Sequence, residues 1–319
     1  MELIKSWGKL LIMGEHAILQ GHPAVGAGLP LELKLLYEPH EDGKWKWQGI
    51  PEIHLPLLYE LVHRLVEWGP APTPQPGMLT LVSDVPLSAG FGSSATLCVA
   101  LSRALYPHLH SKELWTLANR AEGLFHGTPS GIDTALAVYG GLLGFLPDTP
   151  LPHLEPLKGF PFSLVAVSHP RTSSTKILVA ELIKKLQDKD KIATSSMEKL
   201  GKICRETFTL FQNPPAFDPI ESLSQLILQA QEQLSVLGLS TPALNHLNSL
   251  ALERGALGGK LSGAGGGGAQ FFLVRDSEQA TILAQEIERA AKKNHIQLTL
   301  PPTPFVLKPP HFFPVGAES

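Results

Sequence analysis

The spacing of hydrophobic residues along the chain predicts a mixed architecture in its first half. Short runs that alternate apolar and polar residues predict strands, and Gly and Pro residues separate them. These predicted strands cover 10–13, 24–27, 31–37, 78–83 and 142–146. Apolar residues at intervals of three and four predict helices in the same half, over 55–68, 97–105, 111–126 and 130–139.

The second half of the chain has mostly helical spacing. Predicted helices cover 176–186, 194–211, 219–237, 242–254 and 277–293, and one predicted strand covers 269–274. Because strands are concentrated in one half and helices in the other, we expect an α+β protein with two lobes. The predicted division is a strand-rich lobe over 1–150 and a helix-rich lobe over 151–319.

Composition narrows the class of partner. Of the 319 residues, 43% are hydrophobic and 17% are charged, and the net charge is −3. Nothing in this balance favours nucleic acid or an anionic membrane, and we expect neither as a partner. No apolar run reaches the length of a membrane span, and the N-terminal region lacks the pattern of a signal peptide. Two cysteines far apart in the sequence are typical of reduced core thiols, so we expect a cytoplasmic protein.

The segment Asp84–Ala95 has the pattern of a phosphate-binding loop. A predicted strand leads into it, and a predicted helix follows it. The first turn of a helix has unpaired N–H groups and a partial positive charge, which attract an anion. Gly90 and Gly92 allow close approach, and the hydroxyls of Ser93 and Ser94 could reach a phosphate or a metal ion. A tight turn followed by an ordinary helix cap is the structural alternative.

This loop differs from the two commonest phosphate loops. A P-loop requires a lysine after its second glycine, and no lysine follows Gly92. A dinucleotide-binding loop has a third glycine where this chain has Ala95, and it normally follows the first strand of its domain. The loop therefore points to another kind of phosphate site.

Three charged residues fit the chemistry of phosphoryl transfer. Lys9 precedes the first apolar strand, Glu122 lies at the edge of an apolar helix face, and Asp133 lies in the first turn of the next predicted helix. Each has a simple structural explanation by itself: a surface lysine, a solvent-facing glutamate and an acid favoured by the helix dipole. Glu122 and Asp133 are, however, separated by one short turn, so both could face one cleft. Two carboxylates, a lysine and an anion loop are the groups that a phosphotransferase needs.

A second glycine-rich segment, Gly263–Gly268, contains five glycines in six residues. Each glycine carries an entropic cost of about 0.5–1 kcal/mol relative to alanine. We therefore expect a backbone that another group approaches closely, and not a packing element or a flexible linker.

Three segments in this order resemble the GHMP kinases, the superfamily named for galactokinase, homoserine kinase, mevalonate kinase and phosphomevalonate kinase. Gly8–Val25 resembles the N-terminal motif of that superfamily, and Pro86–Ala95 resembles its central phosphate loop. Lys260–Gly268 resembles its C-terminal glycine motif. The resemblance implies a two-lobed GHMP-kinase-like fold with the active site between the lobes, and an enzyme that uses ATP and Mg²⁺.

Within the superfamily, the chain is most similar to the mevalonate kinase family, through His126–Asp133, Tyr139–Gly141 and Arg171–Lys176. This resemblance implies transfer of phosphate from ATP to the 5-hydroxyl of mevalonate. It assigns catalysis to Asp133 and Lys9 and the Mg²⁺ ligands to Ser94 and Glu122. Further residues are implied for nucleotide phosphates (Gly90, Gly92, Ser93, Ser94 and Ala95), for substrate (Glu15, His16 and Thr175) and for a supporting loop (Gly263, Gly265 and Gly266).

Alternative functions remain open at this point. A phosphomevalonate kinase, or another kinase for small alcohols, would share the fold and the catalytic groups. It would need extra basic residues near the acceptor, for which Arg171 and Lys176 are the obvious candidates. A sensor without catalytic activity is disfavoured because Lys9, Glu122 and Asp133 are all present. The oligomeric state is open, with a homodimer as one option.

Overall fold

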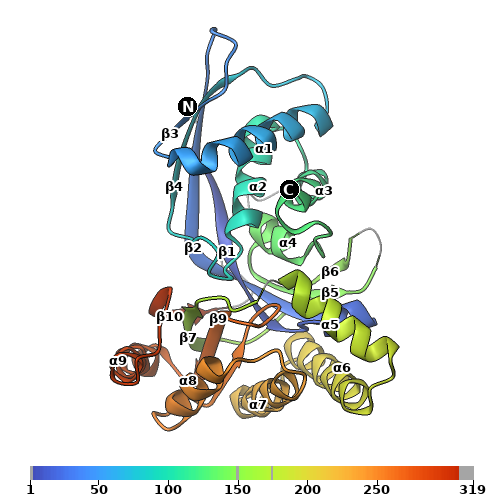
Figure 1. The fold of residues 1–319 in the computed structure, drawn as a ribbon, viewed down its shortest axis with the longest axis vertical. Helices are drawn as coiled ribbons and strands as arrows, with labels where there is room; N and C mark the ends of the chain where they lie inside the picture. The colour runs from blue at the N-terminus through green and yellow to red at the C-terminus, as the bar shows by residue number, and fades with distance from the viewer. Residues whose placement is uncertain (1–2, 149–150, 174, 309–319) are drawn as a thin grey trace.

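The computed structural model describes residues 3–148, 151–173 and 175–308. They form two lobes, one above the other, in Figure 1. The α+β class with two lobes is as predicted. The predicted boundary near residue 150 falls at residues 149–150, which lie outside the described residues. Within the described ranges, no helix combines the length and hydropathy that crossing a bilayer requires.

The first lobe contains a six-stranded sheet in the order β3-β4-β2-β5-β6, with β1 paired to β2 beside this path. The pairs are antiparallel except β3–β4, which is parallel. Its strands are β1 (Leu3–Met13), β2 (Ala24–Pro39), β3 (Lys46–Gln48), β4 (Gly77–Ser83), β5 (Leu142–Leu146) and β6 (His153–Pro156).

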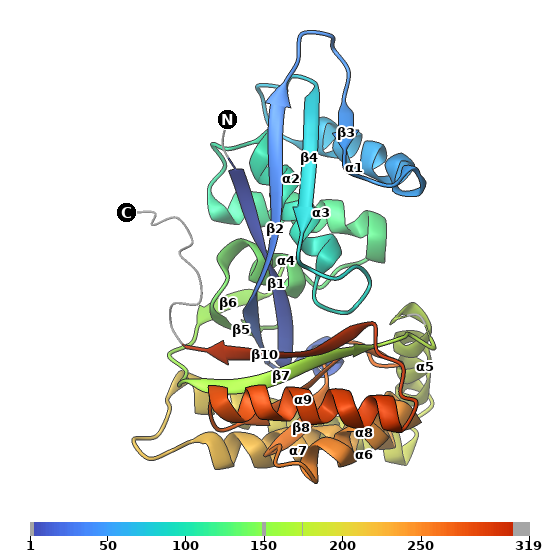
Figure 2. The ribbon, with the colours of Figure 1, turned by 90° about the vertical axis from the view of Figure 1, so that its left-hand side faces the viewer.

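Helices cover one face of this sheet, as Figures 1 and 2 show. They are α1 (Leu55–Trp68), α2 (Ser93–Leu105), α3 (Ser111–His126) and α4 (Ile132–Tyr139), and two short 3₁₀ helices, η1 (Ala17–Gln20) and η2 (Glu52–His54), complete the lobe. Helix α2 is the central one, and almost all of its residues from Ala95 onward are buried. Its N-terminus, which follows the predicted phosphate loop, is therefore held in a fixed position against β1 and β2.

The second lobe is built on an antiparallel sheet of four strands in the order β10-β7-β9-β8. These are β7 (Phe162–His169), β8 (Gly258–Leu261), β9 (Gly268–Val274) and β10 (Leu300–Leu307). Its helices are α5 (Thr175–Gln187), α6 (Lys191–Gln212), α7 (Ile220–Val236), α8 (Pro242–Leu252) and α9 (Ser277–Lys293). One face of the sheet packs on α8 and α9, and the other joins the main core that runs through both lobes.

The predicted helices all form, with ends that differ by a few residues from those expected. The strands were predicted less completely, because 24–27 and 31–37 are parts of one long strand, β2, and most of the second sheet was not foreseen. Every residue of β7 is buried, so its sequence lacks the alternation that marks a half-exposed strand. The proline-rich segment from residue 301 forms β10, a strand that pairs only with β7 among the described strands.

Strand β1 connects the lobes through its outer edge, which faces away from β2. The backbone N–H of Lys9 donates to the carbonyl oxygen of Phe91 at 2.9 Å. The Ser262 hydroxyl accepts from the N–H of Leu11 at 3.0 Å and donates to the Leu11 carbonyl at 2.9 Å. The loop before α2 and the glycine-rich loop before β9 therefore both bind the same strand edge.

The run Gly263–Gly268 is packed mostly against the protein itself, which corrects the expectation that its glycines have no packing role. A Cβ atom on Gly265 would collide with the carbonyl oxygen of Leu239, and one on Gly267 would lie 2.8 Å from Cα of Arg171. A Cβ on Gly263 would meet no atom within 4 Å. The close approach that the sequence predicted is therefore made largely by the chain's own segments, and Gly263 faces open space.

This packing predicts different effects for two alanine substitutions. Gly238 and Gly265 both have left-handed backbones, with φ of 79° and 88°, but an added Cβ on Gly238 meets nothing within 4 Å. We expect Gly238→Ala to lower the free energy of unfolding by about 1–2 kcal/mol, the cost of the backbone conformation alone. Gly265→Ala should cost clearly more, since the Leu239 backbone must also move. Equal losses in chemical denaturation would contradict this explanation.

Candidate active site

Lys9 and Asp133 form an ion pair at the junction of the lobes. The Lys9 Nζ atom lies 3.0 Å from Asp133 Oδ2, and the side chains are 6% and 39% exposed. The aliphatic part of Lys9 packs on the loop before α2, where a Cβ on Gly92 would lie 2.8 Å from Lys9 Cγ. Gly92 therefore has two reasons to be glycine: its φ of 80° and the lysine beside it.

Asp133 is presented by the start of α4. Gly131 caps the helix with φ of 85°, and its carbonyl accepts from the Thr134 hydroxyl at 3.1 Å. The Thr134 hydroxyl also lies 3.1 Å from Asn119 Oδ1, and its side chain is buried. The Asp133 carboxylate points toward Lys9.

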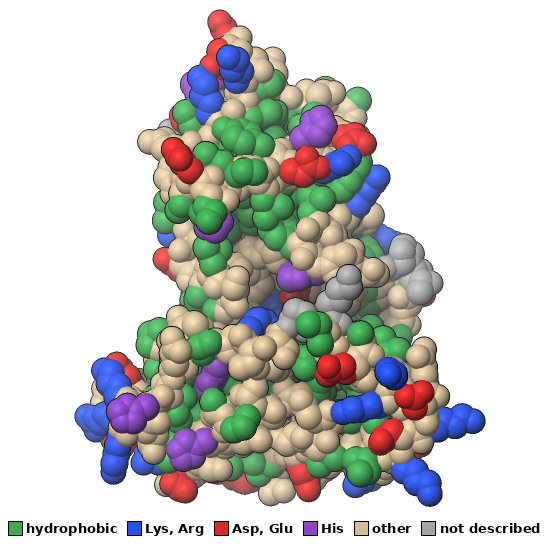
Figure 3. Space-filling model, in the orientation of Figure 1, with side chains coloured by type: hydrophobic (Ala, Val, Ile, Leu, Met, Phe, Trp, Pro, Cys, Tyr) green, Lys and Arg blue, Asp and Glu red, His purple; other side chains and the backbone are tan. Residues whose placement is uncertain are grey.

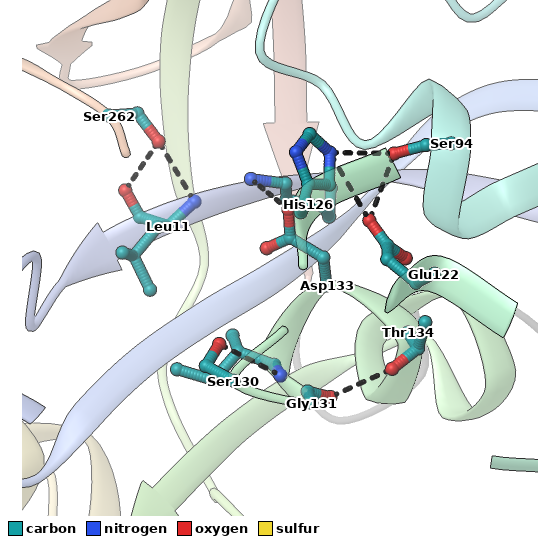
Figure 4. Close-up of polar contacts among 11 residues, drawn as sticks. Leu11, Ser94, Glu122, His126, Ser130, Gly131, Asp133, Thr134 and Ser262 are labelled. Atoms are coloured by element: carbon teal, nitrogen blue, oxygen red, sulfur yellow. Dashed lines mark hydrogen bonds and ion pairs between the residues drawn. The ribbon is translucent and has the colours of Figure 1, made fainter. Parts of the chain in front are cut away.

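Ser94, Glu122 and His126 form a second polar group beside this pair (Figure 4). The Ser94 hydroxyl donates to Glu122 Oε1 at 2.9 Å and lies 3.1 Å from His126 Nε2. Glu122 and His126 are four residues apart on α3, a spacing that places both on one face of the helix. No role for His126 is predicted from the sequence, although its spacing from Glu122 is a signal that could indicate one.

The Glu122 carboxyl group has a weak charge partner: its Oε1 atom lies 3.6 Å from His126 Nε2, and burial lowers the pKa of His126, which favours the neutral imidazole. The Glu122 side chain is 2% exposed, and its Oε2 atom is buried without a hydrogen-bond partner. Burial, followed by the nearby charge of Asp133, raises the pKa of Glu122 to about 8. A cation bound at this carboxylate would remove both penalties.

These residues fit Mg²⁺ that arrives with a nucleotide. The orphaned Glu122 oxygen and the adjacent Ser94 hydroxyl are hard oxygen donors, which Mg²⁺ prefers. No cluster of three or more His, Cys, Asp or Glu side chains among the described residues is placed to hold a metal ion.

The loop before α2 has the geometry of an anion site. Gly90 and Gly92 both have positive φ, and a Cβ on Gly90 would lie 2.8 Å from the backbone nitrogen of Ala269. The loop is thus packed between β1 and the start of β9. The helix that follows begins at Ser93, so Ser93, Ser94 and Ala95 provide the N–H groups that a helix leaves unpaired in its first turn.

The predicted substrate residues are placed differently from one another. His16 is 7% exposed, has a left-handed φ of 59°, and its Nε2 atom lies 3.0 Å from the carbonyl oxygen of Ala264. The Glu15 side chain is 2% exposed and forms an ion pair with Lys260, a residue that the sequence analysis gave no role. Thr175 begins α5, and its side chain lies outside the described part of the chain.

Arg171 adds a positive charge to the site. The sequence marks it as part of the segment 171–176 and as a candidate contact for a phosphorylated acceptor. Its guanidinium packs over Gly268, where an added Cβ would lie 3.0 Å from Nη2. Burial lowers the pKa of Arg171, and the charge of Asp133 opposes this shift. Figure 3 shows basic, acidic and His side chains gathered in the recess between the lobes. The recess therefore combines an anion-binding helix N-terminus, a carboxylate suited to a cation and a Lys–Asp pair.

Comparison with known proteins places this site in a family. Residues 57–141 match the family model described as GHMP kinases N terminal domain, and residues 215–293 match the one described as GHMP kinases C terminal. The two matches together span about half of the chain.

Individual relatives match over most of the chain. The mevalonate kinase of Pyrococcus horikoshii is 27% identical over 304 residues, covering 86% of this chain and 90% of that protein. The mevalonate kinase of Mus musculus is 27% identical, with 88% of each chain covered. The crystal structure of L. major mevalonate kinase in complex with R-mevalonate has a TM-score of 0.81 at 23% identity, covering 97% of this chain and 96% of that one.

The raised pKa of Glu122 predicts how stability without metal depends on pH. Unfolded Glu122 ionises near its ordinary value of 4.5, whereas the folded residue stays neutral up to about 8. Its contribution to stability is therefore present at low pH and is lost as the pH rises through this window. Glu122→Gln removes the loss, so the melting temperature of this variant should fall less than that of the wild type between pH 5 and pH 8.5. We expect a difference of at least about 2 °C, equivalent to about 1 kcal/mol in a chain of this size.

The matched control is Glu181→Gln, at an exposed position on α5. Its melting temperature should follow that of the wild type across the same pH range. If Glu122→Gln and the wild type lost stability in parallel, Glu122 would not be the buried acid that the geometry indicates.

Proposed function

The chain belongs to the GHMP kinases, and from this premise we propose that it transfers the γ-phosphate of ATP to the 5-hydroxyl of mevalonate. The products would be 5-phosphomevalonate and ADP. The relatives that match over most of its length carry the name mevalonate kinase, which supports this choice of acceptor. The buried, free thiols of Cys98 and Cys204 support a place in the cytoplasm.

One observation carries the proposal: the buried ammonium of Lys9 is paired with the more exposed carboxylate of Asp133, close to the N-terminus of α2. A lysine held in this way has a fixed charge and few alternative conformations. Its partner carboxylate remains accessible to an acceptor alcohol. This is the arrangement that transfer of a phosphoryl group to a hydroxyl requires.

Lys9 and Asp133 have complementary roles in the proposed reaction. Lys9 holds the Asp133 carboxylate in place through their ion pair, and this carboxylate would accept a hydrogen bond from the acceptor hydroxyl. As the bond between the acceptor oxygen and the γ-phosphorus forms, the bond from that phosphorus to the β,γ-bridging oxygen breaks and ADP leaves. The hydroxyl proton passes to Asp133, and Lys9 stabilises the negative charge on the acceptor oxygen. Because the transition state of phosphoryl transfer is loose, the main contribution of both residues is to orient the oxygen and stabilise charge.

The loop before α2 would bind the nucleotide phosphates. Gly90 and Gly92 let the backbone approach them, and the N–H groups of Ser93, Ser94 and Ala95 point at the developing charge. Ser94 and Glu122 would hold Mg²⁺, which neutralises phosphate charge when it is bound. Glu122 must lose its proton to bind the ion. The positive charge of the ion would favour this ionised form.

The charges in the recess favour an acceptor that is an acidic alcohol. Arg171 and Lys9 offer positive charge to such an acceptor. A phosphomevalonate kinase is the second candidate, and it would need a larger positive charge for its phosphorylated acceptor. In the described part of the recess, Arg171, whose charge interacts with that of Asp133, adds one cation to Lys9, and this modest positive charge favours the unphosphorylated acceptor.

Turnover with a panel of acceptors tests the substrate directly. The purified protein with ATP and Mg²⁺ should consume ATP with mevalonate and not with 5-phosphomevalonate, homoserine or galactose. Turnover with another member of the panel would mean that the acceptor is not mevalonate but that the protein is still a phosphotransferase. ATP binding without turnover on any acceptor would favour a sensor.

Substitution of Asp133 tests the catalytic pair. Asp133→Asn keeps the size of the side chain but removes its charge and its capacity to take a proton. We expect kcat with mevalonate to fall by about 10²–10⁴-fold, with the melting temperature nearly unchanged because the side chain is partly exposed. Asp188→Asn, at an exposed position after α5, serves as the control and should retain full activity. A kcat for Asp133→Asn within threefold of the wild type would refute the assignment.

Ser94→Ala tests the metal site. Loss of one oxygen ligand should raise the Mg²⁺ concentration that gives half-maximal rate by roughly tenfold, equivalent to about 1.4 kcal/mol. The rate at saturating Mg²⁺ should fall less. Ser277→Ala, at the start of α9 and far from the site, is the control. An unchanged Mg²⁺ dependence would mean that Ser94 is not a ligand.

A further inference from the structure

The turn after β1 is joined to the second lobe by a fully buried ion pair, Glu15 and Lys260, which we call the interlobe pair. The side chains are 2% and 0% exposed. Lys260 Nζ donates to Glu15 Oε1 and to the carbonyl oxygen of Leu261, the latter at 2.7 Å. It also lies 5.4 Å from the ring centroid of Phe271. Every contact that holds this ammonium is therefore internal.

A buried pair of this kind is a weak explanation for stability alone. Taking both charges out of water costs much of the energy that their attraction returns, and an apolar pair of similar volume often performs as well. An ion pair does add specificity of position, because both charged groups are satisfied only when the two segments have one relative position. Removing one member leaves the other buried and uncompensated.

The neighbours of the interlobe pair show which segments it holds together. On one side lie Leu11 and His16, at the end of β1 and in the turn after it. On the other lie Ser262 and Ala264, in the glycine-rich loop. The Ser262 hydroxyl binds both backbone groups of Leu11, and His16 Nε2 lies 3.0 Å from the Ala264 carbonyl oxygen. Residues 260–264 thus contact residues 11–16 at three alternate positions, 260, 262 and 264.

These contacts end close to the catalytic lysine. Lys9 precedes Leu11 by two residues on the same strand, and its backbone N–H lies on the same edge of β1. Within the loop, Gly263 is the glycine whose outer side is open. The contacts between residues 260–264 and residues 11–16 therefore fix the position of the Gly263 backbone relative to Lys9.

We propose that Glu15 is a positioning residue that acts through Lys260: the interlobe pair keeps the glycine-rich loop and Lys9 at the spacing that phosphoryl transfer needs. This inference rests on the proposed kinase function. It assigns Glu15 a different role from the direct substrate contact that resemblance implies, because its carboxylate is buried and already bound by an ammonium group. Loss of Glu15 should misplace the loop and leave the affinity for the acceptor largely intact.

A double-mutant cycle separates the two roles. Glu15→Gln, Lys260→Met and the double variant are compared with the wild type for kcat and KM with mevalonate. We expect Glu15→Gln to lower kcat at least tenfold while KM for mevalonate stays within threefold. In the Lys260→Met background the same change should alter kcat less than threefold, since the interaction it removes is already absent. An equal loss in both backgrounds, or a rise in KM that accounts for the loss, would overturn the proposal.

Hydrogen exchange provides a readout that does not depend on activity. Peptides that cover 261–268 should exchange faster in each single variant than in the wild type, and the double variant should exchange no faster than the singles. Leu283→Ala, in the core between the second sheet and α9, is the control for lost stability and should leave kcat unchanged. If Glu15→Gln does not fold, Glu15→Asp replaces it in the cycle.

The two hypotheses fail in different ways. If the wild type does not phosphorylate mevalonate, the proposed function fails, and the exchange experiment alone judges the interlobe pair. Unchanged exchange over 261–268 in the Glu15 variant would overturn the positioning role even in a fully active kinase.

Discussion

The architecture of the site depends on one constraint, the unpaired edge of β1. A strand that pairs on one side leaves backbone N–H and C=O groups that must find partners when they are buried. In this protein the partners are the Phe91 carbonyl from the loop before α2 and the Ser262 hydroxyl from the glycine-rich loop. Ser262 lies 251 residues along the chain from Leu11. Satisfying one strand edge therefore brings together the two loops and the lysine between them.

Charge is organised around the same strand. Lys9 is buried because its aliphatic part packs on the phosphate loop, and its ammonium is balanced by Asp133. Glu122 is buried beside His126, whose pKa is lowered by burial, so the carboxyl group has no strong positive partner and burial raises its pKa to about 8. The protein thus contains one formed ion pair, Lys9 and Asp133, and one buried carboxyl group, that of Glu122, whose Oε2 atom has no hydrogen-bond partner. Under the proposed function, the ion pair would orient the acceptor, and Glu122 would serve a metal–nucleotide complex.

The sequence predicted the fold class and most of the helices because amphipathic helices such as α3 and α9 carry a clear apolar period. It also singled out Lys9, Glu122 and Asp133, since two carboxylates and a lysine together with an anion loop fit phosphoryl transfer. It missed β7, which is buried on both faces and shows no alternation, and it missed the partner of Glu15. The contact between Glu15 and Lys260 links residues 245 positions apart, and no local pattern reveals such a pairing. The glycine run predicted that another group approaches this backbone closely. Only the fold shows that the groups are the backbone of Leu239 and the segment containing Arg171.

The most direct test of this account is a crystal structure of the protein with mevalonate and a non-hydrolysable ATP analogue. The account predicts the 5-hydroxyl within hydrogen-bonding distance of Asp133 and Lys9, with the γ-phosphate at the N-terminus of α2. It further predicts that Glu15 remains bound to Lys260 and makes no contact with the acceptor. An acceptor hydroxyl away from the Lys9–Asp133 pair, or phosphates bound elsewhere than at α2, would contradict the central claim.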